Sequence, residues 1–232
     1  MSVLYLIPSP LSEGNIQNVL PQNVITVIHS LRKFVVEDIR TARRFLSKTG
    51  HPTPIEQLQF RVLNEHTVGS EIPLFLPFLK AENTGIISEA GVPAVADPGA
   101  QIVQLAHANG ITVVPLVGPS SILMALMASG LNGQSFSFVG YLSAKRNERQ
   151  EHLRRLERKS ANDRQTQIFI ETPYRNMQLL NDIVQCCHSE TMLTIAAGIT
   201  GTSEFIATQR IYQWKKKLPD LQKIPTVFLL QA

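Results

Sequence analysis

Hydrophobic and polar residues along this chain follow two different periods. Short runs rich in β-branched and aromatic residues are typical of strands, and runs with a period near 3.6 residues are typical of helices. In the first half, the pattern predicts strands at 3–7, 24–28, 34–36, 85–88 and 111–115, and helices at 39–48, 100–109 and 120–129. Strands that alternate with helices indicate βαβ units and a mostly parallel sheet.

The second half is richer in predicted strands. They fall at 136–139, 167–171, 193–197, 204–209 and 226–230, with helices at 147–159 and 174–187. This order favours a second α/β unit whose sheet is mixed in direction. We therefore expect two domains, an N-terminal α/β domain over 1–117 and a C-terminal α/β domain over 118–232.

Composition excludes several classes of protein. Hydrophobic residues make up 44% of the chain, enough for a core and too many for a disordered protein. The two cysteines, Cys186 and Cys187, are adjacent and indicate reduced thiols in a cytoplasmic protein. There is no HExxH or CxxC motif, so we expect no metal site. The apolar segment 111–131 is interrupted by Pro and Gly, which indicates two buried elements and no membrane contact.

Charge is distributed unevenly. Residues 1–115 carry 8 Lys/Arg and 9 Asp/Glu, whereas residues 116–232 carry 14 and 9. The basic second half favours an anionic partner. From Pro98 to Ala144 there is no Asp, Glu, Lys or Arg. That segment is either buried core or an interface between domains or subunits, because obligate interfaces are depleted of charge.

The stretch SEAGVPAVADPG at 88–99 is a candidate ligand loop. It follows a predicted parallel strand, where open α/β sheets bind ligands. Gly91 and Gly99 allow a close approach of the backbone, and Glu89 and Asp97 offer acceptors to hydroxyl or amino groups. A plain structural turn is the alternative. The chain contains neither GxxxxGK[ST] nor GxGxxG, so it is neither a P-loop protein nor a Rossmann protein.

A second candidate is PLVGPSSILMALMASG at 115–130. Here Gly118 and Pro119 lead to a predicted helix that begins at Ser120 and Ser121. The free N–H groups of a helix N-terminus can bind a ligand, and an ordinary capped helix is the alternative.

Six stretches, in order, resemble one family. They are LYLIPSP, VEDIRTARRFL, SEAGVPAVADPG with PLVGPSS and ALMASGL, FVGYLSAKRNER, IFIETPYR and TGTSEF. Together they span about 4–230 and are similar to the tetrapyrrole methylase superfamily of S-adenosylmethionine-dependent methyltransferases. The branch they resemble most is the ribosomal RNA small subunit methyltransferase I family.

This resemblance implies a non-Rossmann fold of two α/β domains, with the cofactor in the cleft between them. It implies S-adenosylmethionine as cofactor, S-adenosylhomocysteine as product, and a homodimer. Carried over position by position, it implies cofactor contacts from eight residues: Pro10, Gly91, Val92, Val95, Ser120, Ser121, Glu171 and Ile199.

Methyl transfer to a hydroxyl needs a nearby base. Glu37 and Asp38 are the candidates, because they end a predicted strand and open the helix at 39–48, where Arg40 can pair with Asp38 or bind a substrate phosphate. A charged, solvated helix start is the alternative. The segment 144–164 is basic, and Lys145, Arg146 and Arg149 are expected to bind RNA unless the segment is only a solvated helix.

The leading hypothesis is 2′-O-methylation of a cytidine in 16S ribosomal RNA, with ribosomal RNA or the small ribosomal subunit as substrate. One alternative is methylation of a tetrapyrrole or another small molecule. Another is a protein that binds S-adenosylmethionine without catalysis, because Val92 replaces the family's loop Thr and SPLSEGN replaces its T-P-I-G-N-L turn.

Overall fold

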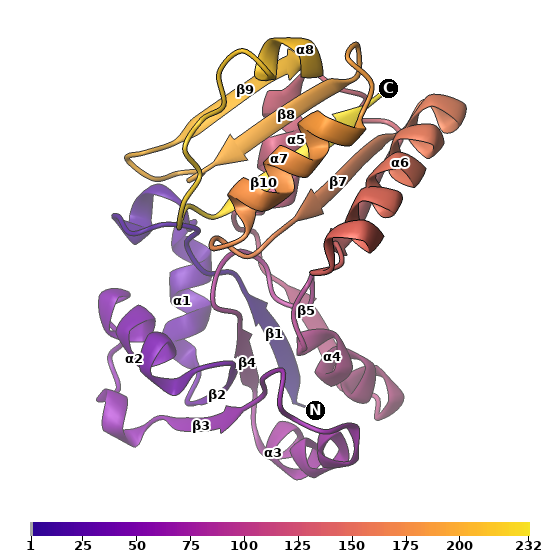
Figure 1. The fold of residues 1–232 in the computed structure, drawn as a ribbon. Helices are drawn as coiled ribbons and strands as arrows, with labels where there is room; N and C mark the ends of the chain where they lie inside the picture. Colours follow the sequence, from indigo (N-terminus) through magenta and orange to yellow (C-terminus); the bar gives the residue numbers. More distant parts are fainter. Residues whose placement is uncertain (1) are drawn as a thin grey trace. The chain divides into compact units, whose positions relative to one another are not determined.

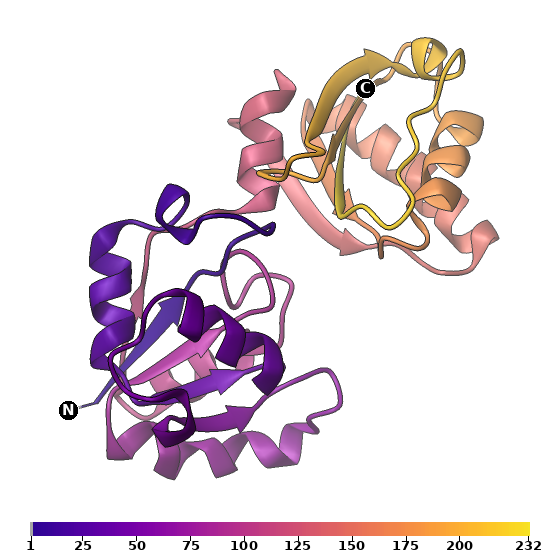
Figure 2. The ribbon, with the colours of Figure 1, turned by 90° about the vertical axis from the view of Figure 1, so that its left-hand side faces the viewer.

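The computed structural model describes residues 2–232, and Met1, where the expected N-terminal domain begins, lies outside the described residues. The chain divides into two compact units, Met1–Ser120 (unit 1) and Ser121–Ala232 (unit 2) (Figures 1 and 2). The division falls three residues after the expected end of the first domain at 117.

Unit 1 is built on a parallel five-stranded sheet in the order β3-β2-β4-β1-β5. Its strands are β1 (Val3–Ile7), β2 (Lys33–Val36), β3 (Gln59–Val62), β4 (Thr84–Ile87) and β5 (Thr112–Pro115). The expected parallel sheet is thus confirmed. Because every strand runs the same way, all five carboxyl ends lie at one edge, where open α/β sheets bind ligands.

Helices cover both faces of this sheet. They are α1 (Gln22–Ser30), α2 (Ile39–Lys48), α3 (Leu76–Ala81) and α4 (Gly99–Ala108), with short 3₁₀ helices at Ile16–Asn18, Ile55–Gln57 and Gly69–Phe75. Phe34 of β2 packs with α1 and α2 in one apolar cluster, whereas its neighbour Val35 packs with α3 and α4 in another. Alternate strand residues therefore face opposite helical layers. Figure 1 shows α1 and α2 on one side of the strands and α4 on the other.

The predicted strand at 24–28 is wrong, because these residues lie within α1. Their β-branched composition favours a strand, but Val24, Ile25 and Ile28 are buried with the i, i+1, i+4 spacing of a helix face. Pro21 in extended conformation precedes the first turn and starts the helix. Packing of one apolar face against the sheet overrides the local preference.

Unit 2 contains a mixed sheet in the order β6-β7-β10-β8-β9. Its strands are β6 (Phe136–Tyr141), β7 (Thr166–Ile170), β8 (Met192–Ala197), β9 (Phe205–Arg210) and β10 (Thr226–Gln231). Only the β6–β7 pair is parallel, and the other three pairs are antiparallel. The mixed sheet was expected. Since β10 separates β7 from β8, the strands β6, β7 and β8 run in one direction and end at one edge.

The helices of unit 2 are α5 (Ser121–Ser129), α6 (Arg146–Asp163), α7 (Asn176–Cys186) and the short α8 (Ile211–Trp214). Leu153 of α6 and Ile183 of α7 are fully buried in one cluster with Phe169 and Phe228 of the sheet. Figure 1 shows α7 in front of this sheet and α5 behind it. Within residues 2–232, no helix is long and apolar enough to cross a membrane.

Candidate functional site

Three loops meet at the carboxyl edge of the unit 1 sheet. Ser9, just after β1, exchanges two backbone hydrogen bonds with Gly91, after β4, at N···O distances of 2.8 and 3.0 Å. The Ser9 hydroxyl also donates to the Ser88 carbonyl oxygen at 2.9 Å. These contacts place Pro10 beside Gly91, so two of the predicted cofactor residues come together.

The loop after β5 joins the same group. A Cβ on Gly118 would overlap the Pro8 ring, so only glycine fits there. A Cβ on Gly91, which has a φ of +75°, would lie 3.5 Å from the Pro119 carbonyl oxygen. Ser120 follows directly and ends unit 1, while Ser121 begins α5 in unit 2.

The rest of the 88–99 loop is held by Asp97. One Asp97 carboxylate oxygen accepts from the backbone N–H groups of Ala94 at 2.8 Å and Gly99 at 2.7 Å. Within this bend, Ala94 and Ala96 have φ values of +67° and +61°, a conformation that costs free energy in residues other than glycine. Burial raises the pKa of Asp97. The tight bend leaves Val95 47% exposed at its tip.

Glu37 and Asp38 leave β2 in different roles. Asp38 caps α2, and its carboxylate accepts from the Thr41 N–H at 2.8 Å. Hydrogen bonds to Thr41 lower the pKa of Asp38. Glu37 is partly buried and accepts from the Glu89 N–H at 3.1 Å. Burial raises the pKa of Glu37, and repulsion from Asp97 and Glu89 adds to that effect.

Glu37 lines two small adjoining pockets in unit 1. One is also lined by Ser9, Asp38, Thr41 and Glu89, and the other by Asp97. Burial also raises the pKa of Glu89. Within the described chain, none of the four carboxylates of this edge — Glu37, Asp38, Glu89 and Asp97 — forms a salt bridge. The exposed Arg40 is the second residue of α2. This edge can therefore accept a proton or attract a positive charge.

In unit 2, the predicted residues Glu171 and Ile199 follow the carboxyl ends of β7 and β8. The Glu171 side chain is fully buried. Its Oε1 accepts from the Thr172 N–H at 2.7 Å and from Arg175 Nε and Nη2 at 3.0 and 2.7 Å. Its Oε2 has no hydrogen-bond partner among residues 2–232. A buried carboxylate oxygen without a partner is costly, so it fits a ligand that brings a donor.

The three basic residues predicted to bind RNA do not share one environment. Lys145 is 80% exposed in its side chain and pairs with Glu148 at 3.0 Å. Arg146 is 62% exposed and its Nε donates to Asp182 at 3.0 Å. Arg149 is buried, and its Nε and Nη2 donate to Asp182 at 2.9 and 2.6 Å. Arg149 is therefore committed to the interior of unit 2, and only the first two can meet a phosphate.

Asp182 is the centre of this buried cluster. Burial alone would raise the pKa of Asp182, but hydrogen bonds from Gln150, Arg149 and Arg146 outweigh it and lower the pKa. These three partners all lie on α6, whereas Asp182 lies on α7, so the cluster joins the two helices. Within the described part of the chain, no group of three or more His, Cys, Asp or Glu is placed to hold a metal ion.

The residues at these two edges fit S-adenosylmethionine chemically. The cofactor carries a positive sulfonium, two ribose hydroxyls and two amino groups, all of which suit carboxylate acceptors. Unit 1 offers the carboxylates of its sheet edge, and unit 2 offers the Glu171 Oε2, which lacks a hydrogen-bond partner among the described residues.

Known proteins with this sequence pattern are ribosomal RNA methyltransferases. The chain is 31% identical over 205 residues to the ribosomal RNA small subunit methyltransferase I of Vibrio cholerae, covering 88% of this chain and 67% of that protein. It is 30% identical over 234 residues to that of Pasteurella multocida, covering 99% and 79%. The chain belongs to the ribosomal RNA small subunit methyltransferase I family. The resemblance drawn from six sequence motifs is thereby confirmed.

The structural comparison agrees with this family on the fold. The crystal structure of the methyltransferase CobJ matches with a TM-score of 0.66 and 15% identity, covering 100% of this chain and 95% of that one. At this identity the likeness concerns the fold alone. A search against family models returned no match.

Several residues of the two edges were not predicted from the sequence. Ser9 and Thr41 act through short contacts to the loop and to Asp38. Arg175 forms an ion pair with Glu171, and Asp182 forms one with Arg149. The i, i+4 spacing of Glu171 and Arg175 is a signal that could have revealed the first pair. No local pattern links Asp182 to Arg149, which is 33 residues away.

Proposed function

We propose that this protein is an S-adenosylmethionine-dependent methyltransferase that methylates the 2′-hydroxyl of a cytidine in 16S ribosomal RNA. Its membership of the ribosomal RNA small subunit methyltransferase I family carries this proposal, through 30% identity across 99% of the chain. The two polar sheet edges support it, because one offers proton acceptors and the other offers basic residues.

Glu37 is the proposed base. When bound, S-adenosylmethionine supplies an activated methyl group and leaves as S-adenosylhomocysteine. The 2′-hydroxyl loses its proton to Glu37 as its oxygen bonds to the methyl carbon. Burial raises the pKa of Glu37 above its ordinary value of 4.5, which makes the carboxylate a stronger base. Asp38 is less suited, because its capping bond to Thr41 lowers its pKa.

The cofactor-binding residues are proposed as the family resemblance gives them. In unit 1 they are Pro10, Gly91, Val92, Val95 and Ser120, and in unit 2 they are Ser121, Glu171 and Ile199. Gly91 is buried and its N–H and carbonyl both bond to Ser9, whereas Val95 at the tip of the same loop is exposed. We propose that the exposed Arg40 contacts the RNA backbone.

A homodimer is proposed through the charge-free segment 98–144. Val117, Leu123 and Met127 in this segment are 71%, 49% and 83% exposed, so it is not all core. Apolar surface without charge is typical of obligate interfaces. Met127→Lys should convert a dimer to a monomer in size-exclusion chromatography with light scattering. Leu74→Lys, at a 62% exposed position of unit 1, is the matched control and should remain dimeric.

The decisive experiment is methyl transfer to isolated small ribosomal subunits that lack the modification. The protein is incubated with radiolabelled S-adenosylmethionine, and the RNA is digested and analysed by mass spectrometry. The proposal requires 2′-O-methylcytidine. Label that appears only in a tetrapyrrole such as uroporphyrinogen would identify a small-molecule enzyme. Tight cofactor binding without transfer to any acceptor would identify a binding protein.

A further inference from the structure

Two tyrosines at the carboxyl edge of the unit 2 sheet lie open to solvent. Tyr174 is 80% exposed and Tyr141 is 55% exposed, which makes them the most exposed aromatic residues of the described chain. Neither ring belongs to the core cluster of unit 2, so packing does not explain them.

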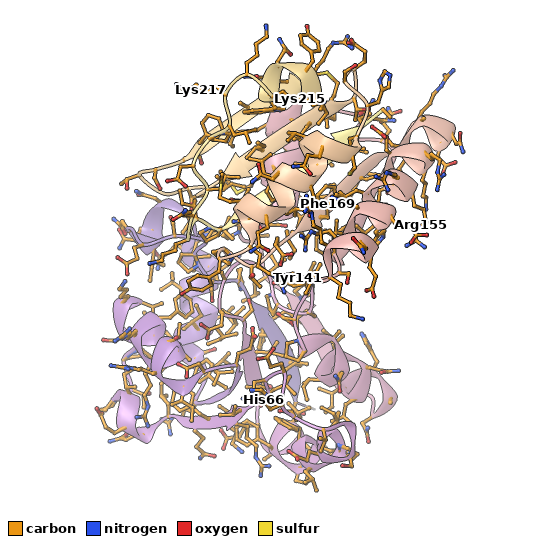
Figure 3. The ribbon with its side chains drawn as sticks, viewed as in Figure 1. His66, Tyr141, Arg155, Phe169, Lys215 and Lys217 are labelled. Carbon is orange, nitrogen blue, oxygen red and sulfur yellow. The ribbon has the colours of Figure 1, made fainter. Side chains whose placement is uncertain are left out.

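Tyr141 owes its position to an irregularity at the end of β6. Phe138 pairs with Ile168 of β7, but the next pairing joins Tyr141 to Ile170, so β6 contains one extra residue. Gly140, with a φ of +72°, accommodates it. Bulges of this kind re-aim a side chain and occur next to functional sites. Figure 3 labels Tyr141 at the end of unit 2 where α6 begins.

Tyr174 is presented by a rigid loop. This loop follows β7, and its turn is closed by a hydrogen bond from the Arg175 N–H to the Thr172 carbonyl oxygen at 2.9 Å. The Glu171–Arg175 ion pair braces it from within. The Lys223 N–H donates to the Pro173 carbonyl oxygen at 3.2 Å and ties the loop to another segment. These contacts fix the backbone that carries Tyr174, so little backbone entropy is lost when a ligand stacks on its ring.

Tyr141 and the loop that carries Tyr174 follow neighbouring strands at the same edge of the sheet, since β6 and β7 are parallel and Tyr141 pairs with Ile170, four residues before Tyr174. Adjacent strands lie about 4.8 Å apart. Figure 1 shows the arrowhead of β7 and the start of α6 at the same end of unit 2. The exposed Lys145 and Arg146 follow Tyr141 within five residues.

Charge at this edge favours a nucleic acid over an apolar protein surface. Glu171 and Asp182 are buried and held by arginines. Glu148 is paired with Lys145. Further basic residues continue along the exposed side of α6, namely Arg154, Arg155, Arg158 and Lys159. Exposed rings beside a basic track are how proteins hold single-stranded nucleic acid.

We propose that Tyr141 and Tyr174 form a stacking platform for unpaired bases of the RNA substrate, next to the phosphate contacts of Lys145 and Arg146. This inference rests on the proposed function and adds to it the requirement for a single-stranded segment. A base is available for stacking only when it is not paired in a duplex.

The test measures binding of a fluorescein-labelled 12-nucleotide single-stranded RNA to the full chain by fluorescence anisotropy. Tyr174→Ala and Tyr141→Ala should each raise the Kd roughly 5- to 100-fold, whereas Tyr174→Phe and Tyr141→Phe should stay near wild type. Tyr212→Ala, at a 41% exposed position of α8, is the matched control. The dependence of log Kd on log salt should be unchanged by the alanine variants but reduced by Lys145→Ala.

Three results would overturn the platform. Alanine variants that bind the RNA as well as wild type would remove the role of the rings. Duplex RNA bound as tightly as the single strand would remove the stacking of unpaired bases. A weakened Kd for S-adenosylmethionine in calorimetry, with RNA binding intact, would assign Tyr174 to the adenine of the cofactor. The first two leave the proposed function standing, whereas wild-type protein that binds no RNA overturns both.

Discussion

The carboxyl edges of the two sheets carry their charge in opposite ways. In unit 1, the partly buried Glu37 and Asp97 have raised pKa values, and neither forms a salt bridge with any residue that the structure describes. In unit 2, the buried Glu171 and Asp182 are each gripped by an arginine. Burying a carboxylate costs free energy, and a paired arginine offsets much of that cost.

This difference between unpaired and ion-paired carboxylates indicates different roles for the two edges. A carboxylate without a cation keeps a raised pKa and can take a proton, whereas an ion-paired carboxylate serves to fix its surroundings. The contrast supports the proposals that unit 1 carries the proton acceptor and that unit 2 presents the basic and aromatic groups. Four substitutions test this contrast.

Asp182→Asn should have the largest effect, on stability. It leaves Arg149 buried without its carboxylate, which costs about 3–5 kcal/mol of unfolding free energy in urea titrations. The control is Glu190→Gln, which breaks the exposed Arg210–Glu190 pair and should cost less than about 1 kcal/mol. Because the pKa of Asp182 is lowered, its stabilising contribution is present above pH 3.8 and is lost as the pH falls below it. Equal losses from both variants would contradict the interior role of this pair.

Glu37→Gln should lower kcat roughly 10²-fold or more, the usual contribution of a general base. In the wild type, the raised pKa of Glu37 means that activity falls with decreasing pH earlier than for an ordinary glutamate, and the variant should lose that limb. Methyl-transfer rates of the wild type and the variant, measured across a pH series, give both the fall in kcat and the change in the pH profile.

Glu56→Gln, an exposed carboxylate of unit 1, is the control for this series. Asp38→Asn keeps a side chain that can cap α2 and should lose less activity than Glu37→Gln. The reverse order would transfer the role of base to Asp38.

Glu171→Gln should weaken S-adenosylmethionine binding by roughly 10-fold, measured by calorimetry. Hydrogen bonds to a charged group contribute about 1.5–3 kcal/mol, and the neutral amide has one acceptor oxygen to serve both Arg175 and the ligand. Arg175→Lys should retain more affinity for S-adenosylmethionine than Arg175→Ala, because lysine keeps a cation beside Glu171. Glu148→Gln, an exposed position of unit 2, serves as control. Unchanged affinity in Glu171→Gln would place the cofactor elsewhere.

Ala96→Gly should have the smallest effect and the opposite sign. Glycine relieves the strain of a φ of +61° and should stabilise unit 1 by about 0.5–1 kcal/mol. The same change at Ala161, exposed within α6, should destabilise unit 2 by about 1 kcal/mol. Thermal unfolding of the two variants gives the comparison, and a loss of stability at both positions would argue against strain in the loop.

Much of the fold could be predicted from the sequence, because most elements obey local rules. The α2 helix was expected at its observed bounds, since Asp38 is a strong N-cap and its apolar face has the right period. Region 24–28 failed because β-branched composition and helical spacing conflict there. The short, exposed β3 gave no signal, because it lacks the alternation of a half-buried strand.

The candidate site could be predicted only in part. The loop with Gly91 was singled out because ligand loops follow parallel strands, and the family resemblance added Pro10; the structure brings these two loops together, and their contact with a cofactor stays a prediction. The sequence did not reveal that Arg149 points inward, since its partner Asp182 lies on another helix. Nor did it reveal that one carboxylate oxygen of Asp97 accepts hydrogen bonds from the backbone of its own loop. Roles of this kind depend on tertiary packing, which local patterns do not encode.

The extra residue in β6 has a consequence for solubility. β6, with the sequence FSFVGY, is an edge strand. It contains no proline and no charged side chain, the two features that discourage a second molecule from adding a strand to such an edge. The break in its ladder after Phe138 leaves only a short regular template for such pairing. Deleting Gly140 would straighten the strand and lengthen that template. Insoluble material during expression, and not a loss of fold, would be the first sign of the change.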